Sequence, residues 1–186
     1  VYGSPSQFTH YNGVRVNGLC RLFHDGSLDT TFTSPMVDTS AFNVIIPRLP
    51  DSSGKIFLCG KFLIKAYPNQ YNTLVRLTTE GKVDTTFSIN NGPTHNLIHG
   101  GATVITKTTD GGYLVGGSFN SYQGVTVSSI AKIDSIGSLE PQYFTSGGPD
   151  SSGVNTVGIP SVNVILKSKL GGYLYLIPIL RCLRIG

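Results

Sequence analysis

The chain has 186 residues, of which 13% are charged and 23 are glycine, with a net charge of +4 and no Trp. That length suffices for one sizeable core, and the recurring apolar runs exclude a disordered chain. The basic residues are scattered from Arg15 to Arg184 without a run, so no nucleic-acid binding is expected. The longest apolar run, 173–180, is too short to span a bilayer, so no membrane insertion is expected either.

Three stretches share one pattern: an apolar alternating run, a turn, and a second short run that ends in Phe. They are 19–32 (LCRLFHDGSLDTTF), 74–87 (LVRLTTEGKVDTTF) and 130–144 (IAKIDSIGSLEPQYF, read with one extra residue). Their turn glycines, Gly26, Gly81 and Gly137, recur at intervals of 55 and 56 residues. A turn flanked by such runs is typical of a β-hairpin, and the period indicates an array of repeats.

The Asp25-Gly26 pair of the first stretch predicts a two-residue hairpin loop. With that loop, Arg21 shares a face with Thr30, and Asp29 lies on the opposite face. Both faces carry apolar residues, which is expected of a sheet packed between two neighbouring sheets.

A second kind of hairpin alternates with the first. It is expected at 43–62, with strands 43–49 and 55–62, and recurs at 103–119 and 162–179. Four short antiparallel strands in a repeat of about sixty residues are typical of a β-propeller blade. We therefore predict an all-β fold, a β-propeller-like array of four-stranded antiparallel blades that forms a partial propeller over a single region, 1–186. The expected units are a partial blade at 1–32, blades at 41–87 and 102–144, and a partial blade at 162–186.

The pairing of a GKIFLCGKF or GGYLVGGSF element with an RLxxDGxxDTTF element resembles the delta-60 repeat family, a predicted β-propeller repeat. The closest matches are 74–87 and 110–119. The resemblance implies a propeller in an extracellular, cell-surface or phage-associated protein, with no defined activity and no catalytic residues to transfer. The chain departs from the pattern at Ile136, at Glu140-Pro141 and in the tail 175–186.

Three acids, Asp29, Asp84 and Glu140, recur three residues after the turn glycines. They suggest either a metal site or ordinary turn chemistry, in which an Asp accepts from backbone amides two residues on. The HDGSLD run lacks the alternating oxygen ligands of a calcium loop, so we predict a structural role and no metal. The predicted structural turn residues are Asp25, Gly26, Asp29, Gly81, Asp84 and Gly137.

A cation recurs at Arg21, Arg76 and Lys132. Such a row can line a surface for anionic ligands, or each stem can lie across its blade and pair with a neighbouring carboxylate or carbonyl. The second arrangement is favoured because each cation lies within an apolar alternation.

The remaining reactive side chains show no site pattern. Cys20, Cys59 and Cys182 share no metal-ligand spacing and are expected to be small buried thiols. His95 and His99 are four residues apart in an expected loop, without the helix and third ligand of a zinc site. No nucleophile, phosphate-loop or triad motif occurs, so we predict no catalytic residue, no metal and no cofactor.

Tyrosines and amides gather in the loops after Phe8, Phe62 and Phe119. Exposed Tyr beside amide side chains suits carbohydrate or protein contacts, although the tyrosines can equally pack between blades. The candidate ligand-contact residues are Tyr11, Asn12, Tyr67, Tyr71, Tyr122 and Gln123.

Two functions follow from these observations. The favoured one is a non-catalytic binding or structural module of a surface-exposed, adhesin-like or phage tail-type protein, located outside the cell, on its surface or on a virion. The alternative is a glycan-active hydrolase or lyase, which requires non-repeated acids that converge on the central channel. Only ten carboxylates occur, and most lie in turns, which favours the first function.

Closure of the propeller adds an expectation about partners. Two full and two partial blades are too few to close a ring, since propellers have about four to eight blades. Besides a protein or carbohydrate ligand, we expect either the rest of a longer chain or self-association, in which two copies exchange terminal strands in a six-bladed ring. The start in mid-pattern without Met favours a piece of a longer chain.

Overall fold

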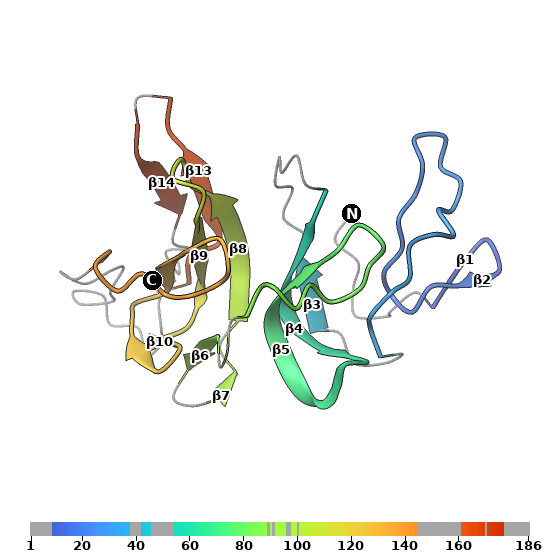
Figure 1. Ribbon diagram of the computed structural model, residues 1–186, viewed down its shortest axis with the longest axis horizontal. Helices are drawn as coiled ribbons and strands as arrows, with labels where there is room; N and C mark the ends of the chain where they lie inside the picture. Colours follow the sequence, from blue (N-terminus) through green and yellow to red (C-terminus); the bar gives the residue numbers. More distant parts are fainter. Residues whose placement is uncertain are drawn as a thin grey trace, which may run out of the picture.

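All regular structure that the computed structural model describes is β, which confirms the all-β prediction. The described residues are 9–37, 42–45, 54–88, 90, 92–95, 98–99, 101–144, 161–169 and 171–176, without the side chains of 42–45, 69–71, 95 and 98–99. In Figure 1 small antiparallel sheets follow one another in a row, from β1 and β2 at one end to β13 and β14 at the other. None of these residues lies in a helix able to cross a membrane. Neither do they form a closed propeller.

The second repeat forms a three-stranded sheet. Its strands, in the order β3-β4-β5, are β3 (Phe42–Ile45), β4 (Ile56–Ile64) and β5 (Tyr67–Leu77). The expected fourth strand is reduced to one bridge between Leu77 and Val83. The ladder stops there because the next residue, Asp84, opens a turn in which Phe87 N–H donates to Asp84 O at 3.1 Å. The prediction of four full strands is corrected to three strands and a bridge.

The third repeat has the same construction. Its strands are β8 (Gly101–Lys107), β9 (Tyr113–Ser118) and β12 (Ile130–Ile133), in the order β12-β9-β8, with a bridge between Ile133 and Leu139. The expected blade range 41–87 encloses the first of these sheets, and the range 102–144 encloses the second except for Gly101, the first residue of β8. The fourth repeat contributes the pair β13 (Val164–Lys167) and β14 (Tyr173–Leu176). The expected strand residues 46–49 and most of the tail, 177–186, lie outside the described residues.

Smaller hairpins lie beside the main sheets. The first is β1 (His10–Tyr11) with β2 (Val14–Arg15). Its counterpart, β10 (Ser121–Tyr122) with β11 (Val125–Thr126), joins β6 (Pro93–His95) and β7 (Ile98–His99) in a four-stranded sheet. His95 and His99 thus lie in paired strands rather than in a loop, and their side chains are outside the described set.

Side chains of each main sheet alternate between two neighbours, as expected of buried blades. On β4, Phe57 and Cys59 face the third repeat, whereas Leu58 faces the first. The core between the first and second repeats contains Leu19, Met36, Leu58, Phe62, Ile64, Val75 and Leu77. The core between the second and third contains Phe57, Cys59, Leu74, Phe87, Ala102, Ile105, Tyr113, Val115, Phe119, Tyr122, Ala131 and Ile133. A smaller third core contains Leu114, Ile130, Val162 and Ile165.

The predicted two-residue loop at Asp25-Gly26 is wrong. Phe23 N–H donates to Ser27 O at 2.9 Å, and Gly26 N–H donates to Phe23 O at 3.0 Å, so the loop has three residues. The third of them, Gly26, has φ of 82°, the left-handed conformation that this loop type requires. The extra residue shifts the register by one and moves Asp29 onto the face that carries Arg21.

The third hairpin stretch also differs from expectation, because it contains no inserted residue. Tyr143 N–H donates to Glu140 O at 3.2 Å, as Phe32 donates to Asp29 O at 3.3 Å. Tyr143 therefore occupies the aromatic position of the repeat, and Phe144 follows it.

Candidate functional site

Each of the first three repeats holds a cluster of one cation, one acid and one aromatic ring. The first cluster is Arg21, Asp29 and Phe32; the second is Arg76, Asp84 and Phe87; the third is Lys132, Glu140 and Tyr143. The cation nitrogen lies 2.7, 2.7 and 2.5 Å from a carboxylate oxygen in the three clusters, respectively. The same cation lies 5.3, 4.5 and 4.2 Å from the centre of the ring.

The three-residue loop explains why these residues meet. The cation lies on the third strand of the blade. The acid follows the turn, on the segment that runs back alongside that strand. In the second cluster Asp84 N–H donates to Arg76 O at 2.9 Å, which places the two residues opposite each other. The sequence contained the signal, since a cation, an acid eight residues later and an aromatic residue three further on occur in each of the first three repeats. Because the predicted two-residue loop placed the cation and the acid on opposite faces, this signal was not recognised as a cluster.

The second oxygen of each Asp closes a local turn. Asp29 Oδ1 accepts from Thr31 N at 2.9 Å and from Thr31 Oγ1 at 2.6 Å. Asp84 Oδ1 accepts from Thr86 N at 3.0 Å and from Thr86 Oγ1 at 2.6 Å. Asp25 makes the same bonds with Ser27, at 2.9 and 2.6 Å. This is the bonding that the structural interpretation of these residues predicts.

The second cluster is buried, with only 6% of the side-chain surface of Arg76 and of Asp84 exposed. Burial raises the pKa of Asp84, but hydrogen bonds from Lys55 and Thr86 and the charge of Arg76 outweigh that effect. The net result is a pKa well below the usual range for Asp, so this carboxylate stays charged and paired.

The third cluster has a Lys in place of Arg. Lys132 Nζ lies 2.5 Å from Glu140 and 2.7 Å from Asp110. Burial lowers the pKa of Lys132, but the bonds to Asp110 and then to Glu140 outweigh burial and raise it. Lys132 in turn lowers the pKa of Asp110. The ammonium is therefore held charged between two carboxylates.

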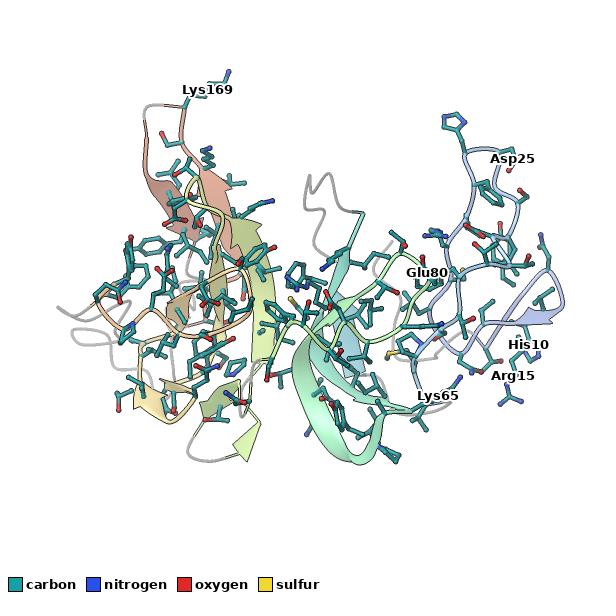
Figure 2. The ribbon with its side chains drawn as sticks, in the orientation of Figure 1. His10, Arg15, Asp25, Lys65, Glu80 and Lys169 are labelled. Atoms are coloured by element: carbon teal, nitrogen blue, oxygen red, sulfur yellow. The ribbon has the colours of Figure 1, made fainter. Side chains whose placement is uncertain are left out.

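The first two clusters also bind the turn of the next repeat. Arg76 Nη1 donates to Ser135 O at 2.8 Å, and Arg21 Nη1 donates to Thr79 O. One residue beyond each ring, a backbone amide donates to the same turn: Thr33 to Glu80 O and Ser88 to Ile136 O, both at 2.9 Å. Figure 2 shows Glu80 of the second turn beside the first repeat, whereas Asp25 lies at the free tip of the first turn. Of the two arrangements considered for the repeated cations, the structure has the paired one.

The turn glycines complete this contact between repeats. Gly81 and Gly137 have φ of 85° and 96° and lie against the rings of Phe32 and Phe87. A Cβ at Gly81 would lie 2.2 Å from Thr33 O, and one at Gly137 would lie 2.8 Å from Ser88 O. Glycine is therefore needed there for conformation and for close approach.

The candidate contact residues divide into two groups. Tyr122 is fully buried, with its hydroxyl 3.3 Å from Gly137 O, and Gln123 donates to the same carbonyl at 3.1 Å and accepts from Leu139 N at 2.9 Å. For these two the packing alternative holds, because the core between repeats includes the ring of Tyr122. Tyr11 is half-buried and donates to Gly26 O at 2.7 Å.

Asn12 and Tyr67 lie on the surface. Asn12 is the first residue of the β1–β2 turn, with φ of 46°, a conformation that Asn tolerates. Tyr67 is 49% exposed at the start of β5. The backbone of Tyr71 lies in the same strand, but its side chain is outside the described residues.

The thiols that the structure describes are inert. Cys59 is fully buried and Cys20 is partly buried, and burial raises the pKa of both. Within the described ranges, no three His, Cys, Asp or Glu side chains are grouped so that they could hold a metal ion.

A cavity of about 490 Å³ lies against the third cluster, with Lys132, Leu139 and Tyr143 in its lining. Tyr143 is 45% exposed, whereas Phe87 at the same position of the second repeat is only 7% exposed. The third cluster thus differs from the others in lacking, among the described residues, a turn that covers its ring.

Repeated antiparallel sheets packed face to face, with the clusters of the first two repeats binding the turn of the repeat that follows, define the chain as a β-propeller repeat protein. Comparison with protein families agrees with this class. A family model described as a domain of unknown function (DUF5122) beta-propeller matches 6–32, 52–87 and 108–143, together more than half of the chain. The chain belongs to this family. Each match ends at the aromatic residue of a cluster, Phe32, Phe87 or Tyr143. No curated protein and no solved structure matches the chain.

Proposed function

We propose that the chain is a non-catalytic binding or structural propeller module. The observation that supports this proposal best is the use of its repeated charged residues. The guanidinium of Arg76 donates hydrogen bonds to Asp84, Thr86 and Ser135 O, all within the blade and the next turn. A catalytic acid must come within hydrogen-bond reach of a substrate, whereas Asp84 is committed to a buried pair with Arg76, which also binds the next turn.

The finer proposal concerns location and ligand. We propose a surface-exposed, adhesin-like or phage tail-type protein of the delta-60 kind, located outside the cell, on its surface or on a virion. The resemblance of 74–87 and 110–119 to that repeat supports it. The ligand is a protein or a carbohydrate, and Tyr67 is the contact residue of choice because its ring is half exposed at the turn between β4 and β5.

A panel of purified polysaccharides tests this proposal. The 186-residue chain is incubated with each polysaccharide, and both retention and new reducing ends or unsaturated products are measured. Retention without new ends is the expected result, and Tyr67→Ala weakens it about tenfold. Phe23→Ala, which removes a ring 55% exposed in another turn, is the matched control and leaves retention unchanged. Catalytic release of new ends would overturn the proposal in favour of a hydrolase or lyase.

A further inference from the structure

The last described strand, β14, has one open edge. Among the described residues it pairs only with β13, and Leu174, Tyr175 and Leu176 are 65%, 49% and 60% exposed. The equivalent strands β4 and β9 pair on both edges, since Leu58 lies opposite Val75 on β5 and Val115 lies opposite Ala131 on β12. No described residues supply, in the sheet of the fourth repeat, the third strand that is present in the two repeats before it.

The main-chain groups of Tyr175 point to this open edge. Ser168 N–H donates to Gly172 O at 3.0 Å, which sets the hydrogen-bonding phase of the β13–β14 ladder. Because hydrogen-bonded pairs alternate along an antiparallel ladder, Leu174 and Leu176 bond to β13. The N–H and C=O of Tyr173 and Tyr175 therefore face away from β13, available to another strand.

The chain carries a matching strand at its other end. The segment 19–22 (LCRL) corresponds to 74–77 of β5 (LVRL) and to β12 (IAKI), but among the described residues it pairs only across its own turn, through the Leu22–Leu28 bridge and the bond from Asp29 N–H to Arg21 O at 3.0 Å. The first-repeat residues that correspond to β9 are 2–7, and they lie outside the described residues. The segment has the sequence of a third blade strand, and no described strand pairs with it in the way that β9 pairs with β12.

Two further surfaces at the same two ends of the row lack a covering neighbour among the described residues: the third cluster at one end and the first turn at the other. The ring of Tyr143 is 45% exposed beside Lys132, and Asp110 and Glu140 bind only two of the three donors of the ammonium group. The first turn has no neighbour at its glycine, since a Cβ at Gly26 meets nothing within 4 Å. Figure 1 shows these parts at opposite ends of the row, so the first turn does not reach the third cluster of the same chain.

We propose that segment 19–22 of a second copy of this chain pairs with β14, and that the first turn of that copy docks on the third cluster. The registers of the second and third repeats place Tyr173 opposite Leu22 and Tyr175 opposite Cys20. Lys132 then donates to His24 O, as Arg21 donates to Thr79 O, and Gly26 lies on the ring of Tyr143.

This interface reproduces one that the chain already contains twice, and it uses the equivalent polar groups. Phe144 has φ of 61°, unlike Thr33 and Ser88, so its amide is not among the predicted contacts. The contact joins two different surfaces, and two copies that exchange them reciprocally form a closed two-fold ring.

The experiment measures the mass of the purified 186-residue chain by sedimentation velocity over a wide range of concentration. The expected species has twice the chain mass of 19.9 kDa. Tyr175→Pro removes the N–H that faces the open edge and keeps the bonds of Leu174 and Leu176 to β13, so dimerisation weakens about a hundredfold. Tyr175→Val is the matched control: it keeps the N–H, introduces the residue found at Val115, and retains the dimer.

Two further measurements keep the test decisive if Tyr175→Pro does not fold. Tyr143→Ser, at a ring already half exposed, weakens dimerisation about tenfold. Amide exchange of 19–22 slows as the wild-type chain dimerises. A wild-type chain that stays monomeric overturns the proposal, as does a dimer that Tyr143→Ser leaves intact and in which exchange of 19–22 does not change.

Discussion

The second and third clusters occupy the same place in their repeats but differ in burial. Phe87 is 7% exposed under the turn of the next repeat, while Tyr143 is 45% exposed with no described turn upon it. The cations differ as well. Arg76 donates to Asp84 of its own cluster and to Ser135 O of the next repeat, whereas Lys132 binds two carboxylates, Asp110 and Glu140. The comparison indicates that a cluster forms within its own repeat, and that the adjoining repeat then buries it.

The largest expected effect is the loss of the cation in the buried cluster. Arg76→Ala leaves Asp84 charged in a site where 6% of its side chain is exposed, and lowers the free energy of unfolding by about 3–5 kcal/mol. Lys132→Ala leaves two carboxylates that are 49% and 26% exposed, so water compensates for the lost partner and the loss is clearly smaller. Urea unfolding of both variants, at a concentration low enough to keep the chain monomeric, measures the difference. Equal losses would contradict the idea that the next repeat sets the energy of a cluster.

The turn glycines separate docked from free turns. Gly81→Ala forces a Cβ to within 2.2 Å of Thr33 O in a left-handed conformation, and we expect a loss of about 2–4 kcal/mol. In the monomer Gly26→Ala meets no neighbour and loses only what its conformation costs, about 1 kcal/mol. Thermal unfolding of the two variants, at one concentration low enough to keep the chain monomeric, checks this order, and a Gly26 variant as unstable as the Gly81 variant would refute it.

Acid should weaken the buried cluster through Asp84. Its folded pKa is depressed, because the bonds from Lys55 and Thr86 and the charge of Arg76 outweigh burial. A depressed pKa stabilises the folded state fully above the unfolded pKa of about 4, and this contribution is lost as pH falls further. The free energy of unfolding of the wild type therefore declines below about pH 4, and Asp84→Ala has a shallower decline. An unchanged slope in the variant would show that other carboxylates govern the acid transition.

The smallest expected effect concerns the hydroxyl group that the third cluster lacks. Thr86 Oγ1 donates to Asp84 Oδ1 at 2.6 Å and accepts from Arg76 Nη2 at 3.1 Å, whereas Gln142 stands at the equivalent position of the third repeat. Thr86→Val preserves volume and removes both bonds, for a loss of about 1–2 kcal/mol. Chemical denaturation measures it, with Thr86→Ser as the control that keeps the hydroxyl and loses less.

The amino-acid sequence by itself determined the repeat period, the all-β class and the positions of the three turn glycines. These features depend on local chemistry: the alternation of apolar residues specifies strands buried on two faces, and Gly26, Gly81 and Gly137 mark turns that need a left-handed residue. The bonding of Asp29 and Asp84 to amides two residues on was predictable for the same reason.

Only the tertiary structure decided which residues meet across repeats. Asp-Gly occurs in hairpin loops of two and of three residues, so the sequence left the register open, and with it the pairing of Arg21 with Asp29. The burial of Tyr122 and the exposure of Tyr143 were equally out of reach, since both are aromatic residues in similar local surroundings. Their difference arises because Tyr122 packs in the core between the second and third repeats, while no described turn covers Tyr143. Contacts such as Arg76 with Ser135 O join residues 59 apart, beyond what a local pattern specifies.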